Sequence, residues 1–270
     1  IGFIDNKETW YLENACGHHW LACRIPNDKY FVTGNQSRFR DYDPKDNDNF
    51  LADKKLLSFA EENGLWNPAE GKFDFHKAYS KDDIADHTYN YTRVWGLQQL
   101  FTPSMVQDVN VNDFPVYAKP DSGHIGIREL RKAFRFHYDG TEHDPYLHNN
   151  GHEPWRPVSI FRTTQTHLLQ VRPWLPDAIG HITYVANGMA DLGVFLPIYQ
   201  GVKSFPKAYQ IGDNHCSNDS AYWKFRKVMT LAMTNYNAYA SLVKETYAKL
   251  EDENDQRQKE FEAKYLAIYK

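Results

Sequence analysis

The 270-residue sequence has only three cysteines, Cys16, Cys23 and Cys216. This odd and sparse set differs from the even, dense set of a small secreted domain held by disulfides, so we expect a reducing compartment and a cytoplasmic protein. The sequence also lacks C-x-x-C, H-E-x-x-H, G-x-S-x-G and Gly-rich phosphate-loop motifs. Common signatures of zinc sites, serine hydrolases and nucleotide-binding loops are therefore missing.

Long apolar runs and long basic runs are missing as well. The longest apolar stretch, 178–199, is interrupted by His181, Asn187 and Asp191, each of which would be costly inside a bilayer. We therefore expect no membrane span. The 31 basic residues are outnumbered by 35 acidic ones, which gives a formal net charge of −4, so nucleic acid is not an expected partner.

The patterns that are present predict an α+β fold. Aromatic and β-branched runs in GFIDNKETWYLE, HHWLACRI and YFVTGNQ, separated by turn signals at 14–17 and 26–29, predict an antiparallel meander. VSIFRTTQTHLLQVR and HITYVANGMADLGVFLPIY predict a second hairpin of two largely buried strands. Helical patterns cover 55–66, 75–79, 93–101 and 128–137.

The last part of the chain changes to a helical period. Apolar residues recur at helical spacing from residue 219, with Ser217 or Asn218 as the expected cap. Beyond Leu250, mixed charges predict an exposed helix that packs through Phe261, Tyr265 and Ile268. With no internal repeat and no low-complexity linker, we expect one domain over 1–270, helical from about 217 to 270.

Two segments contain several histidines, which are common metal ligands. In ENACGHHWLAC, a strand would place His19 and Cys23 roughly 13 Å apart, whereas zinc needs its ligand atoms at about 2.0–2.3 Å. His143, His148 and His152 share a polar loop rich in Asn and Gly, which would not preorganise a metal site. We expect no metal and no cofactor in either segment.

Physical patterns alone reveal no nucleophile–base pair. The sequence blocks NACGHHWLACRIPNDKYFVTGNQSRF, TYNYTRVWGLQQLF, GTEHDPY, EPWRPVSIFRTTQTHLLQVRP, GMADLGVFLPIYQG and SAYWKFRK occur in this order, and together they resemble the dipeptidase A family of N-terminal-nucleophile (Ntn) cysteine peptidases. One departure is Cys16, where the family's GGHHW-like turn would have a glycine.

This resemblance implies an Ntn-hydrolase fold, a four-layer αββα sandwich of antiparallel sheets. In such enzymes the nucleophile is the first residue of the mature chain, a cysteine whose own α-amino group is the base. Because this sequence begins at Ile1, we expect it to match the middle and C-terminal part of a parent protein. The fold would then be incomplete at its N-terminus, the missing N-terminal part would supply the thiol, and this chain alone would be inactive.

The wider Ntn amidohydrolase group, which includes bile-salt and penicillin V acylases, suggests two catalytic residues here. Asn35 in FVTGNQSRF resembles the asparagine that faces the nucleophile, where its amide can donate to an oxyanion. Arg93 in TYNYTRVWG resembles the arginine that steadies the nucleophile, where its charge favours thiolate. We expect the two side chains to line a common cleft at one end of the sheets.

The resemblance therefore predicts a dipeptidase that acts on small peptides through a thioester, with self-association into a homo-oligomer as a further expectation. Two alternatives remain open at this stage. One is a catalytically inert scaffold or interaction fragment. The other is an acylase of the bile-salt or penicillin V type, which would cleave a nonpeptide amide on the same fold.

Overall fold

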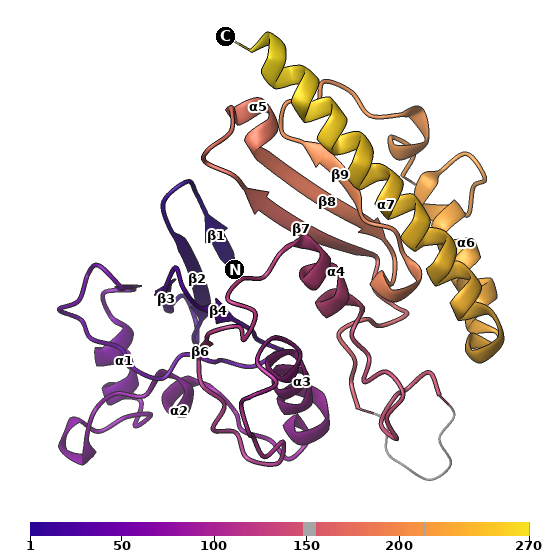
Figure 1. Cartoon of the computed structure of the whole chain (residues 1–270). Coiled ribbons are helices and arrows are strands. Elements are labelled where there is room, and N and C mark those ends of the chain that lie inside the picture. Colours follow the sequence, from indigo (N-terminus) through magenta and orange to yellow (C-terminus); the bar gives the residue numbers. More distant parts are fainter. Residues whose placement is uncertain (148–154, 213, 270) are drawn as a thin grey trace. The chain divides into compact units, whose positions relative to one another are not determined.

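The computed structural model describes residues 1–147, 155–212 and 214–269. The chain forms two compact units, Ile1–Ile125 and Gly126–Lys270, each of which combines helices with antiparallel strands (Figure 1). The predicted α+β class is therefore confirmed.

The first unit is built on a four-stranded antiparallel sheet with the strand order β1-β2-β3-β5, and β4 pairs with β6 in a separate two-stranded ladder. The elements of this unit are β1 (Gly2–Ile4), β2 (Thr9–Asn14), β3 (Trp20–Ile25), β4 (Tyr30–Phe31), β5 (Phe50–Ala52), α1 (Leu56–Glu62), the 3₁₀ turn η1 (Pro68–Glu70), α2 (Phe75–Tyr79), the π-helical turn η2 (His87–Tyr91), α3 (Thr92–Phe101) and β6 (Tyr117–Ala118).

The predicted meander of three runs is correct only in part. The first run, GFIDNKETWYLE, forms two antiparallel strands, β1 and β2. Strand β2 pairs with β3 as predicted, but the other edge of β3 is taken by β5 and not by the YFVTGNQ run. The YFVTGNQ run leaves the strand after Phe31 because the backbone beyond it bonds to side chains. The N–H groups of Arg38 and Phe39, for example, donate to the carboxylate of Glu13.

His18 and His19 were predicted to lie in a strand, but they precede it. Strand β3 begins at Trp20, so His18 and His19 lie in the turn that Gly17 opens with a φ of +64°. A left-handed backbone favours glycine there. The spacing expected along a strand therefore does not apply to His19, which lies before β3. His19 instead places its Nδ1 2.6 Å from Oδ1 of Asp53.

Helices α1, α2 and α3 occur where the sequence predicts them. The apolar face of the first sheet packs against α1 and α2 in one core. Its buried residues are Leu21, Cys23, Phe39, Leu56, Ala60, Phe73, Phe75 and Ala78. Phe31 of β4 packs against the same core, which thereby positions the start of the loop that follows β4.

The second unit contains a three-stranded antiparallel sheet, β7-β8-β9. In Figure 1 the long helix α7 lies along this sheet, with α4 beside β7. The elements of this unit are α4 (Ile127–Arg135), β7 (Gln165–Val171), α5 (Asp177–Gly180), β8 (His181–Asn187), the 3₁₀ turn η3 (Ala190–Leu192), β9 (Leu196–Tyr199), the 3₁₀ turn η4 (Lys207–Tyr209), α6 (Ala221–Met233) and α7 (Tyr236–Ile268).

The predicted second hairpin is confirmed as β7 and β8, but the prediction that both strands are largely buried is wrong for β7. Thr166 and Leu168 are buried, whereas His167 and Leu169 are exposed. Strand residues alternate between faces, so one face of β7 packs on the unit's core and the other face is open.

The C-terminal part is helical, as predicted, but it contains a break. Helix α6 begins at Ala221 after Ser220, so neither Ser217 nor Asn218 is its cap. Helix α7 starts after Asn235, whose side chain accepts from the backbone N–H of Ala238. An asparagine that caps a new helix in this way favours a helix start over continuation.

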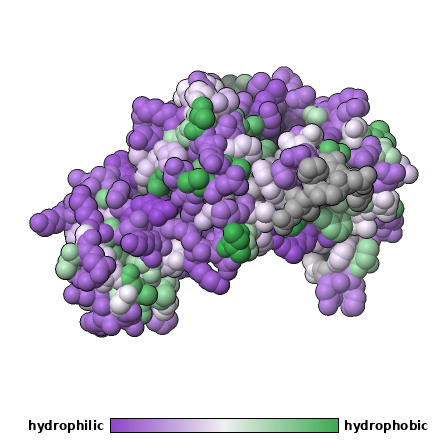
Figure 2. Space-filling model, turned by 90° about the horizontal axis from the view of Figure 1, so that it is seen from below, coloured by the Kyte–Doolittle hydropathy of each residue, from purple (hydrophilic) through white to green (hydrophobic). Residues whose placement is uncertain are grey.

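On the face shown in Figure 2, hydrophilic residues predominate and hydrophobic ones form separate small patches. No helix in the described part of the chain combines the length and the apolar character needed to cross a membrane.

Candidate functional site

Asn35 lies in the loop after β4, at a pocket with a volume of about 700 Å³. The end of β2, this loop and residues 79–90 line the pocket, all within the first unit. The Asn35 side chain is exposed. The sequence-predicted asparagine therefore stands where a molecule in the pocket could reach its amide.

Arg93 lies in the first turn of α3, directly after the π-helical turn η2. Its Nε donates to the carbonyl of Tyr89 at 2.7 Å, and the guanidinium lies 5.1 Å from the centre of the Tyr89 ring. Its Nη2 donates to Oδ1 of Asn35 at 2.9 Å. The expected proximity of Asn35 and Arg93 is therefore confirmed across 58 positions of sequence. The expected common cleft is not, because Asn35 is among the residues that line the pocket and Arg93 is not.

The bond from Arg93 determines which way the Asn35 amide faces. Because Oδ1 of Asn35 accepts from the guanidinium, the Nδ2 group is turned away from Arg93. Among the described residues, no hydrogen bond uses this Nδ2 as a donor. The arrangement leaves an exposed N–H donor beside a cation, which is the combination that stabilises a developing oxyanion.

Asn90 is a third member of the site that sequence reasoning missed. It is 3% exposed, and its Oδ1 accepts from the backbone N–H of Asn35 and from Nη2 of Arg93, both at 2.7 Å. Its Nδ2 donates to Asp86. A signal was available, because Asn90 precedes Arg93 by three residues and such pairs share a helix face.

Two buried residues anchor the loop that carries Asn35. Glu13 at the end of β2 accepts from the Ser37 hydroxyl at 2.6 Å and from the Arg38 N–H at 2.9 Å. Burial raises the pKa of Glu13, against these hydrogen bonds, which lower it. His76 of α2 places Nδ1 2.7 Å from the Ser37 carbonyl oxygen. Sheet, loop and helix are thereby tied together around the pocket.

The charged side chains that line the pocket are mostly acidic. Lys81 and Asp83 form an ion pair of 2.9 Å at the rim. Glu13 and Asp86 add two further carboxylates. The guanidinium of Arg93 therefore lies beside an acidic pocket, and the rim favours a cationic group such as a free peptide amine.

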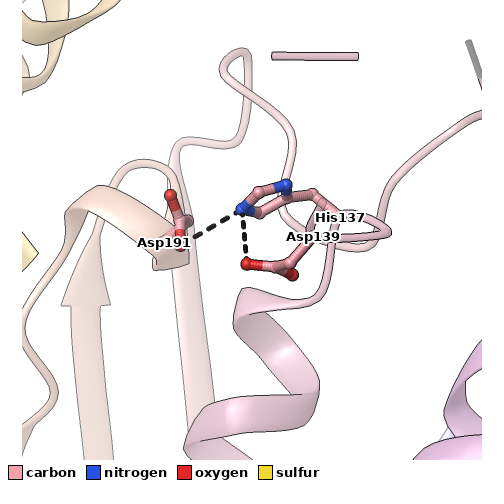
Figure 3. Close-up of side chains that lie close together, drawn as sticks. All are labelled: His137, Asp139 and Asp191. Atoms are coloured by element: carbon pink, nitrogen blue, oxygen red, sulfur yellow. Dashed lines mark ion pairs between the residues drawn. The ribbon is translucent and has the colours of Figure 1, made fainter. Parts of the chain in front are cut away.

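The second unit contains a second cluster of ionisable side chains, one histidine surrounded by three carboxylates. Nδ1 of His137 is 3.0 Å from Oδ1 of Asp144, and its Nε2 is 3.1 Å from Asp139 and 3.6 Å from Asp191. Figure 3 shows the carboxylates of Asp139 and Asp191 converging on one edge of the ring. Burial lowers the pKa of His137, but the hydrogen bonds to these carboxylates outweigh it and raise the pKa to about 11.

Three ligand atoms of this cluster lie within 4.8 Å of one another, one each from His137, Asp139 and Asp191. A metal would need a neutral imidazole, whereas the raised pKa keeps His137 protonated. The ammonium of Lys244 also lies 2.7 Å from Oδ1 of Asp191. These contacts favour a buried ion network over a metal centre.

The histidines singled out from the sequence as an alternative metal set lie elsewhere. His143 stacks on Trp155 with ring centres 3.8 Å apart. His148 and His152 fall outside the described residues. The sequence analysis did not identify the His137 cluster. Asp139 and Asp144 are close to His137 in the chain, but Asp191 comes from a distant segment that only the fold brings to the ring.

The three cysteines are all free. Cys16 and Cys216 are exposed, whereas Cys23 is buried in β3. Burial raises the pKa of the Cys23 thiol, so this side chain stays a neutral thiol near pH 7. A thiol in this state is a poor nucleophile.

An exposed amide donor on an anchored loop at a pocket, with a cation bonded to its oxygen, defines a site suited to acyl transfer. A comparison with protein-family models shows which family the chain matches. Residues 1–249 match the model described as Peptidase family C69, and the chain belongs to this peptidase family.

Curated relatives share dipeptidase names. A "Probable dipeptidase" of Salmonella dublin is 52% identical over 215 residues, which cover 79% of this chain and 48% of that protein. "Dipeptidase A" of Lactobacillus helveticus is 30% identical over 245 residues, which cover 90% of this chain and 51% of that protein. The chain thus spans about half the length of the curated relatives it matches.

Proposed function

We propose that the protein containing this chain is a cysteine-type dipeptidase of the Ntn class, and that Asn35 and Arg93 belong to its catalytic site. The observation that carries the proposal is the 2.9 Å bond from Arg93 to Asn35. It turns the amide N–H of an exposed asparagine outward at a pocket. Membership of a peptidase family and the dipeptidase names of the relatives support the same function.

In the proposed mechanism, a thiolate attacks the carbonyl carbon of the scissile peptide bond. The carbonyl oxygen becomes an oxyanion that accepts from Nδ2 of Asn35. The intermediate collapses to a thioester, and the leaving amine takes a proton from the general acid. Water then hydrolyses the thioester and regenerates the thiol. Arg93 favours the thiolate by its charge and holds the Asn35 amide in its orientation.

The thiol and its base are assigned by the family resemblance to an N-terminal cysteine and its own α-amino group. Cys23 is unsuited to this role because it is buried with a raised pKa. The acidic rim formed by Asp83 and Asp86 suits a substrate with a free amino end, as a dipeptide has. The dipeptidase names favour dipeptide hydrolysis over the cleavage of a nonpeptide amide.

The same proposal includes the finer description of the fold. We propose that both units belong to one Ntn-hydrolase domain, in which a second layer covers the open face of β7 that carries His167 and Leu169. The free state of all three cysteines fits a reducing compartment such as the cytoplasm. Self-association stays a prediction that analytical ultracentrifugation can check.

The test is an assay of the full-length protein with a panel of dipeptides and their N-acetylated forms. We expect release of amino acids from the free dipeptides, slower release from the acetylated ones, and loss of both after iodoacetamide treatment. Hydrolysis that persists after complete thiol alkylation would contradict the cysteine mechanism. A folded protein that cleaves none of the panel would contradict the function and favour an inert scaffold.

A further inference from the structure

We propose that Asn90 is a positioning residue of this site, which sets the spacing between Arg93 and the loop that carries Asn35. The inference rests on the proposed function, and it adds a residue that acts through the other two. Asn90 is 3% exposed, whereas Asn35 is exposed. It lies at the inner wall of the pocket, where its hydrogen bonds can hold Arg93 and the loop that carries Asn35 together.

The hydrogen bonds of Asn90 use both ends of its amide. Oδ1 accepts from the Asn35 backbone N–H and from Nη2 of Arg93, and Nδ2 donates to Asp86. Because the bond to Asp86 fixes the amide orientation, the oxygen must face the loop and the guanidinium. Removing the Asn90 amide would leave its hydrogen-bonding partners buried without a replacement for water. The cost in free energy is then larger than that of the lost hydrogen bonds alone.

The backbone at Asn90 and the backbone of the facing loop at Gly34 both fit this role. Asn90 lies in the π-helical turn η2 (His87–Tyr91), and π-helical turns occur frequently at functional sites. Opposite it, a Cβ at Gly34 would lie 2.7 Å from Oδ1 of Asn90 and 3.2 Å from Nη2 of Arg93. Only a glycine lets the loop approach this closely without displacing those atoms.

The expected effect of Asn90 on the reaction rate follows from the contacts that it shares with Arg93 and Asn35. Nη2 of Arg93 bonds to Asn90 and Asn35 together, so losing Asn90 removes one hydrogen bond from the guanidinium and one from the backbone of Asn35 and allows the two to shift relative to each other. A displacement of about 1 Å in a catalytic group can cost about 10²-fold in rate. The effect should fall on kcat and on the thiol pKa, while KM changes little.

The first test compares Asn90→Leu with the double variant Asn90→Asp/Asp86→Asn in the full-length enzyme. Leucine keeps the approximate size and removes the acceptor, whereas the double variant keeps an oxygen for both N–H groups and lets an amide at position 86 donate to the new carboxylate, so that two carboxylates do not face each other. We expect Asn90→Leu to lower kcat by about 10²-fold and to raise the apparent pKa of thiol alkylation, with the double variant less affected. The matched control is Asn110→Leu, because Asn110 is an exposed loop asparagine that bonds only locally, to Asp108.

A double-mutant cycle separates positioning from a general loss of structure. In an Arg93→Ala background, we expect Asn90→Leu to lower kcat less than about twofold, because residues that act as a unit are not additive. A full additional loss in that background would overturn the proposal. So would an unchanged kcat for Asn90→Leu in an otherwise wild-type enzyme that hydrolyses dipeptides.

A crystal structure of the Asn90→Leu variant tests the same claim without an activity assay. We expect Nη2 of Arg93 to leave hydrogen-bonding distance of Oδ1 of Asn35, with the rest of the first sheet unchanged. Gly34→Ala should displace the same pair, and Gly2→Ala is its control because the nearest atom to a Cβ there is 3.9 Å away. An intact Arg93–Asn35 contact in Asn90→Leu would overturn the positioning role. Inactivity of the wild-type enzyme toward every dipeptide would instead refute the proposed function.

Discussion

Nη2 of Arg93 lies 2.9 Å from Oδ1 of Asn35, although 58 positions separate the two residues. One comes from the first turn of a helix and the other from a loop after a short strand. The contact turns the Asn35 amide N–H away from Arg93 and keeps the guanidinium charge on the oxygen side of the same amide. This relationship connects the fold of the first unit with its proposed chemistry.

Replacing Asn35 with alanine should slow acylation by about 10²–10³-fold, the typical loss for one oxyanion donor. Because the side chain is exposed, the free energy of unfolding should change little. Burst kinetics with a chromogenic dipeptide analogue would measure the acylation step, and urea unfolding would measure stability. Asn110→Ala is the control. An acylation rate within a factor of about two of wild type would remove Asn35 from the mechanism.

Replacing Arg93 with glutamine should raise the pKa of the nucleophilic thiol, since a cation near a thiol favours the thiolate. The acid limb of the pH–rate profile should therefore move to higher pH. Arg93→Lys should restore part of the shift, but not the bonding geometry, because lysine lacks the planar fork of arginine. The rate of iodoacetamide alkylation against pH measures the thiol pKa. An identical profile in Arg93→Gln would show that Arg93 does not act on the thiol.

The sequence was sufficient to predict that Asn35 and Arg93 lie close together, because each lies in a block that resembles a known family. It was not sufficient for Glu13, whose role depends on contacts between distant segments, and for Asn90 it offered only the spacing of three residues from Arg93. Glu13 looks like one more polar residue at a strand end. Only the fold shows that its carboxylate takes the backbone N–H groups of Arg38 and Phe39.

Removal of the Glu251 carboxylate should strongly destabilise the second unit. Glu251 is 5% exposed, and it accepts from Arg135 at 2.6 Å and from the Phe195 backbone N–H at 2.7 Å. Breaking a buried ion pair from one side costs about 3–5 kcal/mol, so we expect a loss of this order for Glu251→Ala. Denaturant unfolding measures it.

The control for Glu251 is Glu253→Ala on the same helix. Glu253 forms an exposed pair with Arg257 at 3.4 Å, and such pairs contribute less than about 1 kcal/mol. Equal losses in the two variants would show that the Glu251 pair adds nothing beyond a surface contact.

Alkaline pH should weaken the second unit through His137. The folded-state pKa of about 11 lies above the ordinary value of 6.5, so the stabilisation is fully present below about pH 6.5 and is lost as the pH rises toward 11. The free energy of unfolding should fall by up to about 1.4 kcal/mol per pH unit across this window. The groups that face the ring are Asp139, Asp144, Asp191, Tyr236 and Lys244.

Urea unfolding of the chain from pH 7 to 10 checks this dependence, with His137→Gln as the comparison. The variant should be less stable at pH 7 and should show a shallower decline. Parallel curves for the two proteins would mean that His137 does not carry the pH dependence.

The sequence predicted most helices and the first and second hairpins because their hydrophobic periods are local. It misplaced β4, since a run of seven residues with β propensity (30–36) became a two-residue strand, and beyond that strand the N–H of Asn35 bonds to a side chain. It also described the charges of α7 as solvated. Glu251, Asp255 and Glu262 instead meet Arg135, Arg131 and Arg172, and charge patterning on one helix gives no information about partners on another.

The most direct test of the central claim is a crystal structure of the full-length enzyme with a peptide aldehyde. Addition of the thiol to the aldehyde carbon forms a hemithioacetal whose oxygen takes the place of the oxyanion. We predict that this oxygen lies about 2.7–3.1 Å from Nδ2 of Asn35, with Arg93 still bonded to Oδ1 of the same side chain. An adduct whose oxygen is held by other donors, with Asn35 beyond hydrogen-bonding distance, would contradict the account.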